Sequence, residues 1–238
     1  MCGIFCSLSR AGYITPDEKT ARLLQNRGPD HIDTRQIVLR DHGSIVSEAS
    51  AAVHATFLST VLALRGSAIV EQPLVDATTG SVLCWNGEAW SIGGQLVVGN
   101  DSQIIFSKLL QASATSVGGS EGAVLDLLSS IRGPYALVFH DARNKRVYYG
   151  RDCLGRRSLL RKSTSDGSLV LSSVCDNASG EAWAEVEADG IYIMNFESGD
   201  CSPTLPTPTL VRHCRSDQAA ESELSFVGEF SASRLLLI

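Results

Sequence analysis

The order of the apolar patterns along the chain is the feature that most constrains its fold. Runs rich in Val, Leu, Phe and Thr, typical of strands, come first; helical periodicities follow; and strand patterns then return. The predicted strands cover residues 2–9, 34–39, 52–64, 81–85, 89–92, 135–141, 146–152, 159–162, 168–174 and 190–196. This order predicts an α+β fold in which helices pack on two sheets.

The helices are recognised by their end signals and apolar spacing. Thr15 and Glu18 have the spacing of a capping box, with a proline between them at the first helical position. Asn100 or Asp101 caps the second helix, whose apolar residues recur at i,i+4. The predicted helices cover residues 16–26, 101–113 and 121–131.

Composition and charge narrow the functional class. A chain of 238 residues is long enough for one large domain or two small ones, and its net charge of −6 argues against nucleic acid or an anionic membrane as partner. The longest apolar window, residues 51–64, contains polar residues and ends at Arg65, short of a membrane span. No secretory signal is evident, so we expect a soluble, cytoplasmic protein.

Cysteine usage and the C-terminal composition set further expectations. The seven cysteines have irregular spacings and form no CxxC pair, so we expect buried thiols and neither a metal site nor a cofactor. Beyond Glu197 the chain is rich in Pro, Ser and Thr and has little periodicity. We therefore expect a domain over 2–197 and a linker-like or poorly ordered tail over 198–238.

The opening MCGIFC places a cysteine directly behind the initiator methionine. A small second residue permits removal of Met1, after which Cys2 would carry both a thiol and a free α-amine. Their ordinary pKa values, about 8.5 and about 7.7–8.0, are close, so the amine can accept the thiol proton. A terminal cysteine thus brings its own base, although a cysteine at this position is by itself a weak signal.

Five stretches, taken together, are more specific. They are MCGI at the start, NRGPD at 26–30, QPL followed by WNGE within 72–88, GNDSQIIF at 99–106 and GRDCLGRRSLL at 150–160. In this order they resemble the class II glutamine amidotransferases, and within them the asparagine synthetase branch. The resemblance implies a four-layer α/β/β/α sandwich of the N-terminal nucleophile hydrolase type, with two antiparallel sheets flanked by helices.

The resemblance also implies roles for individual residues. Cys2 would attack the side-chain amide carbon of glutamine, and the Asn86 amide and the Gly87 N–H would stabilise the oxyanion. An asparagine donates without charge and a glycine permits close approach, which suits that task. The alternative is that Asn-Gly forms only a tight turn.

Three further residues would hold the substrate. By resemblance, Arg65 would bind the α-carboxylate of glutamine, Asp101 would bind its α-ammonium, and Glu88 would add to the same pocket. Asp101 could instead, or also, be a helix N-cap. The chain departs from the family at Gln103, where an acidic residue is usual, and in the short spacing between Arg65 and Gln72.

Two other groups of residues receive no chemical role. Arg27 and Asp30 look like a framework turn beside the site. Four arginines around Asp152 are expected to form a solvated face with one structural ion pair; they are Arg151, Arg156, Arg157 and Arg161.

Two functional hypotheses follow. In the first, the chain hydrolyses L-glutamine and supplies ammonia to a synthetase domain or partner; in the second, it is an inactive module of the same fold, acting in interaction or regulation. A third possibility is an unrelated α+β protein with chance motifs. The SGGxDS-type phosphate loop of asparagine synthetases is absent from the sequence, so we expect neither ATP binding nor asparagine synthesis by this chain alone.

Overall fold

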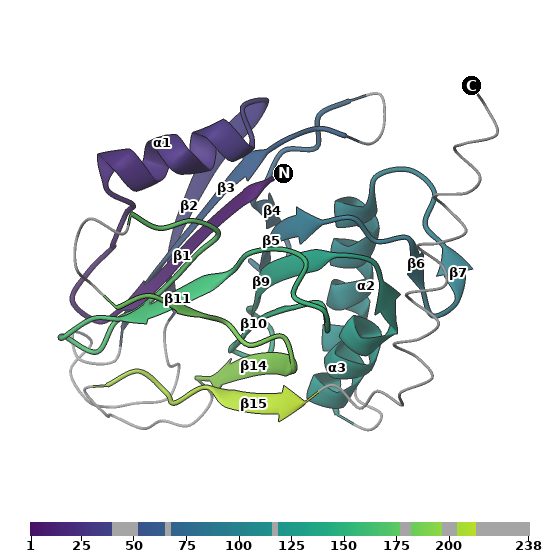
Figure 1. The fold of residues 1–238 in the computed structure, drawn as a ribbon. Helices are drawn as coiled ribbons and strands as arrows, with labels where there is room; N and C mark the ends of the chain where they lie inside the picture. Colours follow the sequence, from purple (N-terminus) through teal and green to yellow (C-terminus); the bar gives the residue numbers. More distant parts are fainter. Residues whose placement is uncertain (40–51, 65–67, 116–118, 177–181, 197–203, 213–238) are drawn as a thin grey trace.

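The fold is described from a computed structural model of the chain (Figure 1). The structure describes residues 1–39, 52–64, 68–115, 119–176, 182–196 and 204–212. Within them, two six-stranded sheets lie face to face, and a small three-stranded sheet stands beside the second. Every pairing between these strands is antiparallel.

The first sheet is built around the N-terminal strand. Its order is β13-β11-β12-β1-β3-β2. The strands are β1 (Gly3–Ser9), β2 (His31–Leu39), β3 (Val53–Val61), β11 (Leu160–Ser163), β12 (Leu169–Ser172) and β13 (Ala184–Glu185). Because β1 is central and wholly buried, the chain places its first residues in the middle of the sheet rather than at an edge.

The second sheet faces the first. Its order is β15-β14-β10-β9-β5-β4. The strands are β4 (Leu74–Val75), β5 (Val82–Gly87), β9 (Tyr135–Asp141), β10 (Arg146–Arg151), β14 (Gly190–Asn195) and β15 (Thr209–Arg212). The small sheet is made of β6 (Ser91–Ile92), β7 (Gln95–Leu96) and β8 (Ile131–Arg132).

Three apolar clusters define four layers. One cluster fills the space between the sheets and includes Ile4, Phe57, Val138 and Tyr149. The helix α1 (Glu18–Arg27) covers the outer face of the first sheet through Leu24. The outer face of the second sheet is covered by α2 (Asp101–Ser113) and α3 (Ser120–Ser130), as Figure 1 shows. This is the predicted α/β/β/α sandwich.

The start of α1 differs from the predicted one, whereas α2 begins at Asp101 as predicted. α1 begins at Glu18, and its cap is Asp17, whose carboxylate accepts from Thr20 N at 2.9 Å; the Thr15 capping box does not form. An aspartate one residue before the first helical turn is an equally good cap, and it prevails here. α2 is capped by Asn100 rather than Asp101.

The C-terminal part contains one strand that the composition did not predict. Residues 209–212 form β15, which pairs with β14 at the edge of the second sheet, although they lie in the segment expected to have little regular structure. Residues 213–238 lie outside the described part of the chain. Among the described residues, no helix combines the length and apolarity needed to cross a membrane.

Candidate active site

Cys2 lies immediately before β1 and is held from two sides. Its carbonyl oxygen accepts a hydrogen bond from Arg27 Nε, at the end of α1, at 3.1 Å. Its sulfur accepts from Leu62 N, just beyond β3, at 3.5 Å. The helix and the strand thus fix the backbone and the side chain of a residue that, so near a chain terminus, would otherwise fray.

The environment of Cys2 works in both directions on its thiol. Burial raises the pKa of the thiol, whereas the Leu62 N–H and the N-terminal ammonium oppose that rise. The Met1 ammonium donates to Arg27 O at 3.2 Å. Burial lowers the pKa of this ammonium, and Arg27 and Arg157 add to the effect while Cys2 opposes it. The Met1 amine, whose pKa is lowered, and the Cys2 thiol, whose pKa is raised, therefore lie next to each other.

A cavity of about 60 Å³ opens beside Cys2, large enough for several water-sized groups. Asn86, the penultimate residue of β5, lines it and is only 1% exposed. Among the residues that the structure describes, none forms a hydrogen bond with Asn86 Nδ2. A buried amide donor without a partner is costly, and it is satisfied when an acceptor enters the cavity.

Gly87 presents its backbone to the same cavity. Along an antiparallel strand, successive backbone N–H groups point to opposite sides. Glu88 N donates to Pro134 O on the β9 side, so the Gly87 N–H points away from β9. It points to the side on which Trp85 N donates to Gln72 Oε1. A Cβ at Gly87 would come within 2.7 Å of Tyr135 Cβ. Only glycine therefore fits here without displacing β9.

Asp101 also lines the cavity, as does Glu88. Asp101 is buried, and its Oδ2 accepts from Ala89 N at 2.8 Å and from Trp85 Nε1 at 3.1 Å. Asn100 performs the capping instead, accepting from Ser102 N at 3.1 Å. The carboxylate is thus set by tertiary contacts rather than by the helix start.

Five of the six predicted site residues meet around this one cavity: Cys2, Asn86, Gly87, Glu88 and Asp101. The sixth, Arg65, lies outside the described residues. The cavity also includes Arg157, which sequence reasoning placed on a solvated face, and Gln72, which was noted only as part of a motif. For Arg157, the signal was its place in the GRDCLGRR stretch, but spacing alone does not separate four neighbouring arginines.

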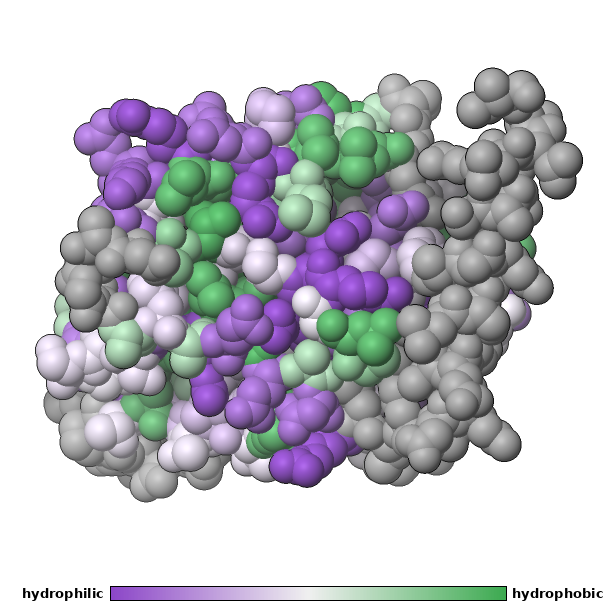
Figure 2. All heavy atoms as spheres, viewed as in Figure 1, coloured by the Kyte–Doolittle hydropathy of each residue, from purple (hydrophilic) through white to green (hydrophobic). Residues whose placement is uncertain are grey.

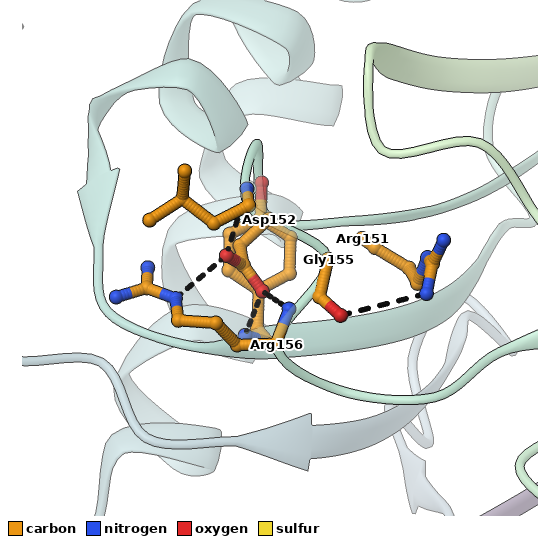
Figure 3. Close-up of polar contacts among 6 residues, drawn as sticks. Arg151, Asp152, Gly155 and Arg156 are labelled. Carbon is orange, nitrogen blue, oxygen red and sulfur yellow. Dashed lines mark hydrogen bonds and ion pairs between the residues drawn. The ribbon is translucent and has the colours of Figure 1, made fainter. Parts of the chain in front are cut away.

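The four arginines around Asp152 lie in different surroundings and make different contacts. Figure 3 shows Asp152 between Arg156 and the backbone of the turn. Its oxygens accept from Arg156 Nε at 2.8 Å, from Arg156 N at 3.0 Å, from Tyr135 N at 3.1 Å and from Leu154 N at 3.2 Å. Arg151 pairs with Glu185 at 3.2 Å. The predicted structural ion pair is therefore Arg156–Asp152, and it holds the turn that carries Arg157.

The mouth of the cavity is apolar. Figure 2 shows apolar atoms gathered beside the amino terminus, over the segment that follows β3. Met1 and Leu64, which line the cavity, are 49% and 74% exposed.

The chain has clear relatives among curated proteins, although no protein-family model matches it. It is 33% identical over 211 residues to asparagine synthetase domain-containing protein 1 of Bos taurus, and 34% identical over 204 residues to that of Homo sapiens. These alignments cover 86% and 83% of this chain but 30% and 29% of the relatives. The chain therefore spans about 30% of the length of the curated relatives it matches.

Solved structures show the same fold. Glutamine phosphoribosylpyrophosphate amidotransferase from B. subtilis matches 90% of this chain and 50% of its own, with a TM-score of 0.54 and 17% identity. An allosteric regulatory enzyme of purine biosynthesis gives 0.56, also at 17% identity. The chain thus belongs with the asparagine synthetase domain-containing proteins, about 30% of whose length it matches, and it has the N-terminal nucleophile sandwich of glutamine amidotransferases.

Proposed function

We propose that this chain hydrolyses the side-chain amide of L-glutamine, with Cys2 as nucleophile, and supplies ammonia to an acceptor domain or partner. The observation that carries the proposal is the buried Asn86 Nδ2, which has no hydrogen-bond partner among the described residues and lines the cavity that contains Cys2. A donor kept open beside a nucleophile is the arrangement that an oxyanion requires.

The reaction balances with the groups at hand. Once Met1 is removed, the Cys2 α-amine takes the thiol proton, and the sulfur forms a bond to the amide carbon. Asn86 Nδ2 and the Gly87 N–H donate to the resulting oxyanion. The α-ammonium returns its proton to the leaving nitrogen, so that the C–N bond breaks and ammonia departs. Water then hydrolyses the glutamyl thioester, releases glutamate and restores the thiol.

Substrate recognition would use the carboxylates of the cavity. Asp101 is oriented by Ala89 N and Trp85 Nε1, which suits it to the α-ammonium of glutamine, and Glu88 lies beside it. Arg65 remains the proposed partner of the α-carboxylate. The ammonia acceptor would be a synthetase domain, on the same polypeptide or a separate one, as the names of the relatives suggest.

The test is glutamate release from glutamine by the purified chain, after intact mass has established that Met1 is absent. Cys2→Ala should abolish release, whereas Cys175→Ala, which changes a half-buried cysteine that does not line the cavity, should leave it unchanged. Equal release by the wild type and Cys2→Ala would contradict the proposal.

A second candidate is an inactive module of the same fold. It is favoured by the partial burial of Cys2, which raises the pKa of its thiol and lowers the thiolate population while Met1 is in place. If a chain with a free Cys2 amine binds glutamine or its acceptor domain but releases no glutamate, this second candidate is correct.

A further inference from the structure

A second and larger groove lies at the opposite end of the sandwich from Cys2. It has a volume of about 490 Å³, within the range of roughly 300–1,000 Å³ typical of small-molecule sites. Its floor includes Leu169, which pairs in register with Leu8 near the far end of β1. At about 3.3 Å per residue, Leu8 is roughly 20 Å from Cys2 along the strand. In Figure 1, β14 and β15 lie on this side, away from the amino terminus.

The charge of the groove contrasts with that of the whole protein. Two of the described residues that line it are cations, Arg161 and Lys162, and none is acidic, in a chain whose net charge is −6. Burial raises the pKa of the nearby Tyr192, Arg161 opposes this rise, and Glu187 and Asp189 add to it, but neither carboxylate lines the groove. The lining is therefore positively charged at Arg161, which suits an acid group of a ligand.

Aromatic side chains hold Arg161 in place. Its guanidinium lies 5.2 Å from the centre of the Tyr192 ring, and that ring stacks on Tyr149 at 5.0 Å with only 5° between the planes. Lys162 lies over Trp183 at 5.0 Å. A guanidinium ordered on an aromatic face is oriented for an acid group at little additional cost in entropy.

Tyr149 adds a buried polar group. It lines the groove, and its hydroxyl lies beside Arg161 but makes no hydrogen bond of full geometry with a described residue. Burial raises the pKa of this hydroxyl to about 12, and the Arg161 charge opposes the rise. The phenol thus stays protonated and can donate. The remaining walls are apolar: Leu169, Met194, Leu205, Pro206 and Pro208.

We propose that this groove is a second binding site, for a small organic anion whose acid group pairs with Arg161 and the Tyr149 hydroxyl and whose apolar body rests on the leucine and proline wall. Its position at the other end of the sheets makes it independent of the Cys2 cavity. The proposal holds whether or not the chain hydrolyses glutamine.

The test uses 8-anilinonaphthalene-1-sulfonate, an aromatic anion whose fluorescence rises in apolar sites, titrated against the full chain. We expect saturation at one site. Arg161→Gln should weaken binding at least tenfold and Tyr149→Phe severalfold. Arg22→Gln removes an exposed arginine from α1 and should change nothing. Equal affinity in all four proteins, or no saturable binding, would overturn the proposal.

Displacement of the bound dye from the wild-type protein by other small compounds tests the proposal even if a variant fails to fold. Phenyl phosphate should displace the dye, whereas phenol, which has the ring without the charge, should displace it far less. Equal displacement by phenol would show that the groove does not select anions. Equal displacement by inorganic phosphate alone would show that the apolar wall plays no part. Either result overturns the assignment.

Discussion

Asn86 and Asp152 are both 1% exposed and lie on either side of the start of β9. Their side chains differ in how far their hydrogen-bonding capacity is used. Asp152 accepts four hydrogen bonds: two from Arg156, one from Leu154 N in the turn and one from Tyr135 N at the start of β9. The Nδ2 of Asn86 has no partner among the described residues. The first group is completed by the fold itself; the second can be completed only by something that enters the cavity.

The difference teaches how to sort buried polar residues. A completed group holds the framework, so its loss should appear in the free energy of unfolding. An open donor costs stability in the empty protein, so its loss should appear in the chemistry instead. The predictions below test this division.

The largest effect is expected for Asp152→Ala. It removes the acceptor of three backbone N–H groups and leaves Arg156 without its carboxylate, so the free energy of unfolding should fall by about 3–5 kcal/mol. Urea denaturation measures it. A loss below about 1 kcal/mol would show that Asp152 is not a framework residue.

Asn86→Ala should behave in the opposite way. The rate of glutamine hydrolysis should fall by about 10²–10³ while the unfolding midpoint barely moves. The matched control is Asn144→Ala, since the Nδ2 of Asn144 donates to Ser113 O at 2.9 Å and to Asp141 Oδ2 at 2.8 Å. Asn144→Ala should lose stability and keep its rate. The same pattern in both variants would refute the division.

His140 is a buried polar residue outside the Cys2 cavity with an atom left unpaired in the described part of the chain, so it tests whether such an atom alone indicates a functional site. Its Nδ1 is buried without a partner among the described residues, but it does not line the Cys2 cavity. Burial lowers the pKa of His140 from 6.5 to about 4, so between these values only the unfolded chain binds the proton.

Stability should therefore be complete above pH 6.5 and fall as the pH drops toward 4, by about 3 kcal/mol in all. The free energy of unfolding, measured by denaturation at several pH values, is compared between the wild type and His140→Leu. The carboxylates titrate in both proteins, so the difference between the two pH profiles is the contribution of His140. If both proteins lose stability equally over this range, the pKa of His140 is not depressed.

The smallest effect separates two neighbours at the start of α2. Asn100 also lines the cavity, but its Oδ1 already accepts from Ser102 N and Oγ. Asn100→Ala removes this N-cap and should cost about 1 kcal/mol of stability with little change in KM. Asp101→Asn keeps the shape of the side chain but removes the charge, and it should raise the KM for glutamine. Urea denaturation and steady-state kinetics on both variants decide between capping and binding, and an unchanged KM for Asp101→Asn would exclude the binding role.

Local periodicity predicted two sheets with helices packed on them, whereas the order of the four layers was implied by the resemblance. The β9–β10 hairpin and the two helices over the second sheet follow directly from apolar spacing. The register that turns the Gly87 N–H toward the cavity could not be predicted, because it depends on which strand lies beside β5.

The sequence also could not predict which of two chemically similar neighbours performs a given role. Asn100 and Asp101 are both good N-caps, but the Trp85 indole N–H donates to the Asp101 carboxylate, and Asn100 caps the helix. Likewise, three arginines look equivalent in sequence but lie in different places. Arg156 contacts a buried carboxylate, Arg157 lines the cavity beside Cys2, and Arg161 lines the distant groove. Such separation arises only from tertiary packing.

The two-sided hold on Cys2, by Arg27 at the end of α1 and by Leu62 beyond β3, has a consequence for anyone handling the protein. The amino terminus borders the cavity, so a purification handle attached there would lie across the cavity mouth. For the same reason, in a chain that keeps Met1, a fluorophore coupled selectively to the terminal amine would report whether the cavity is occupied.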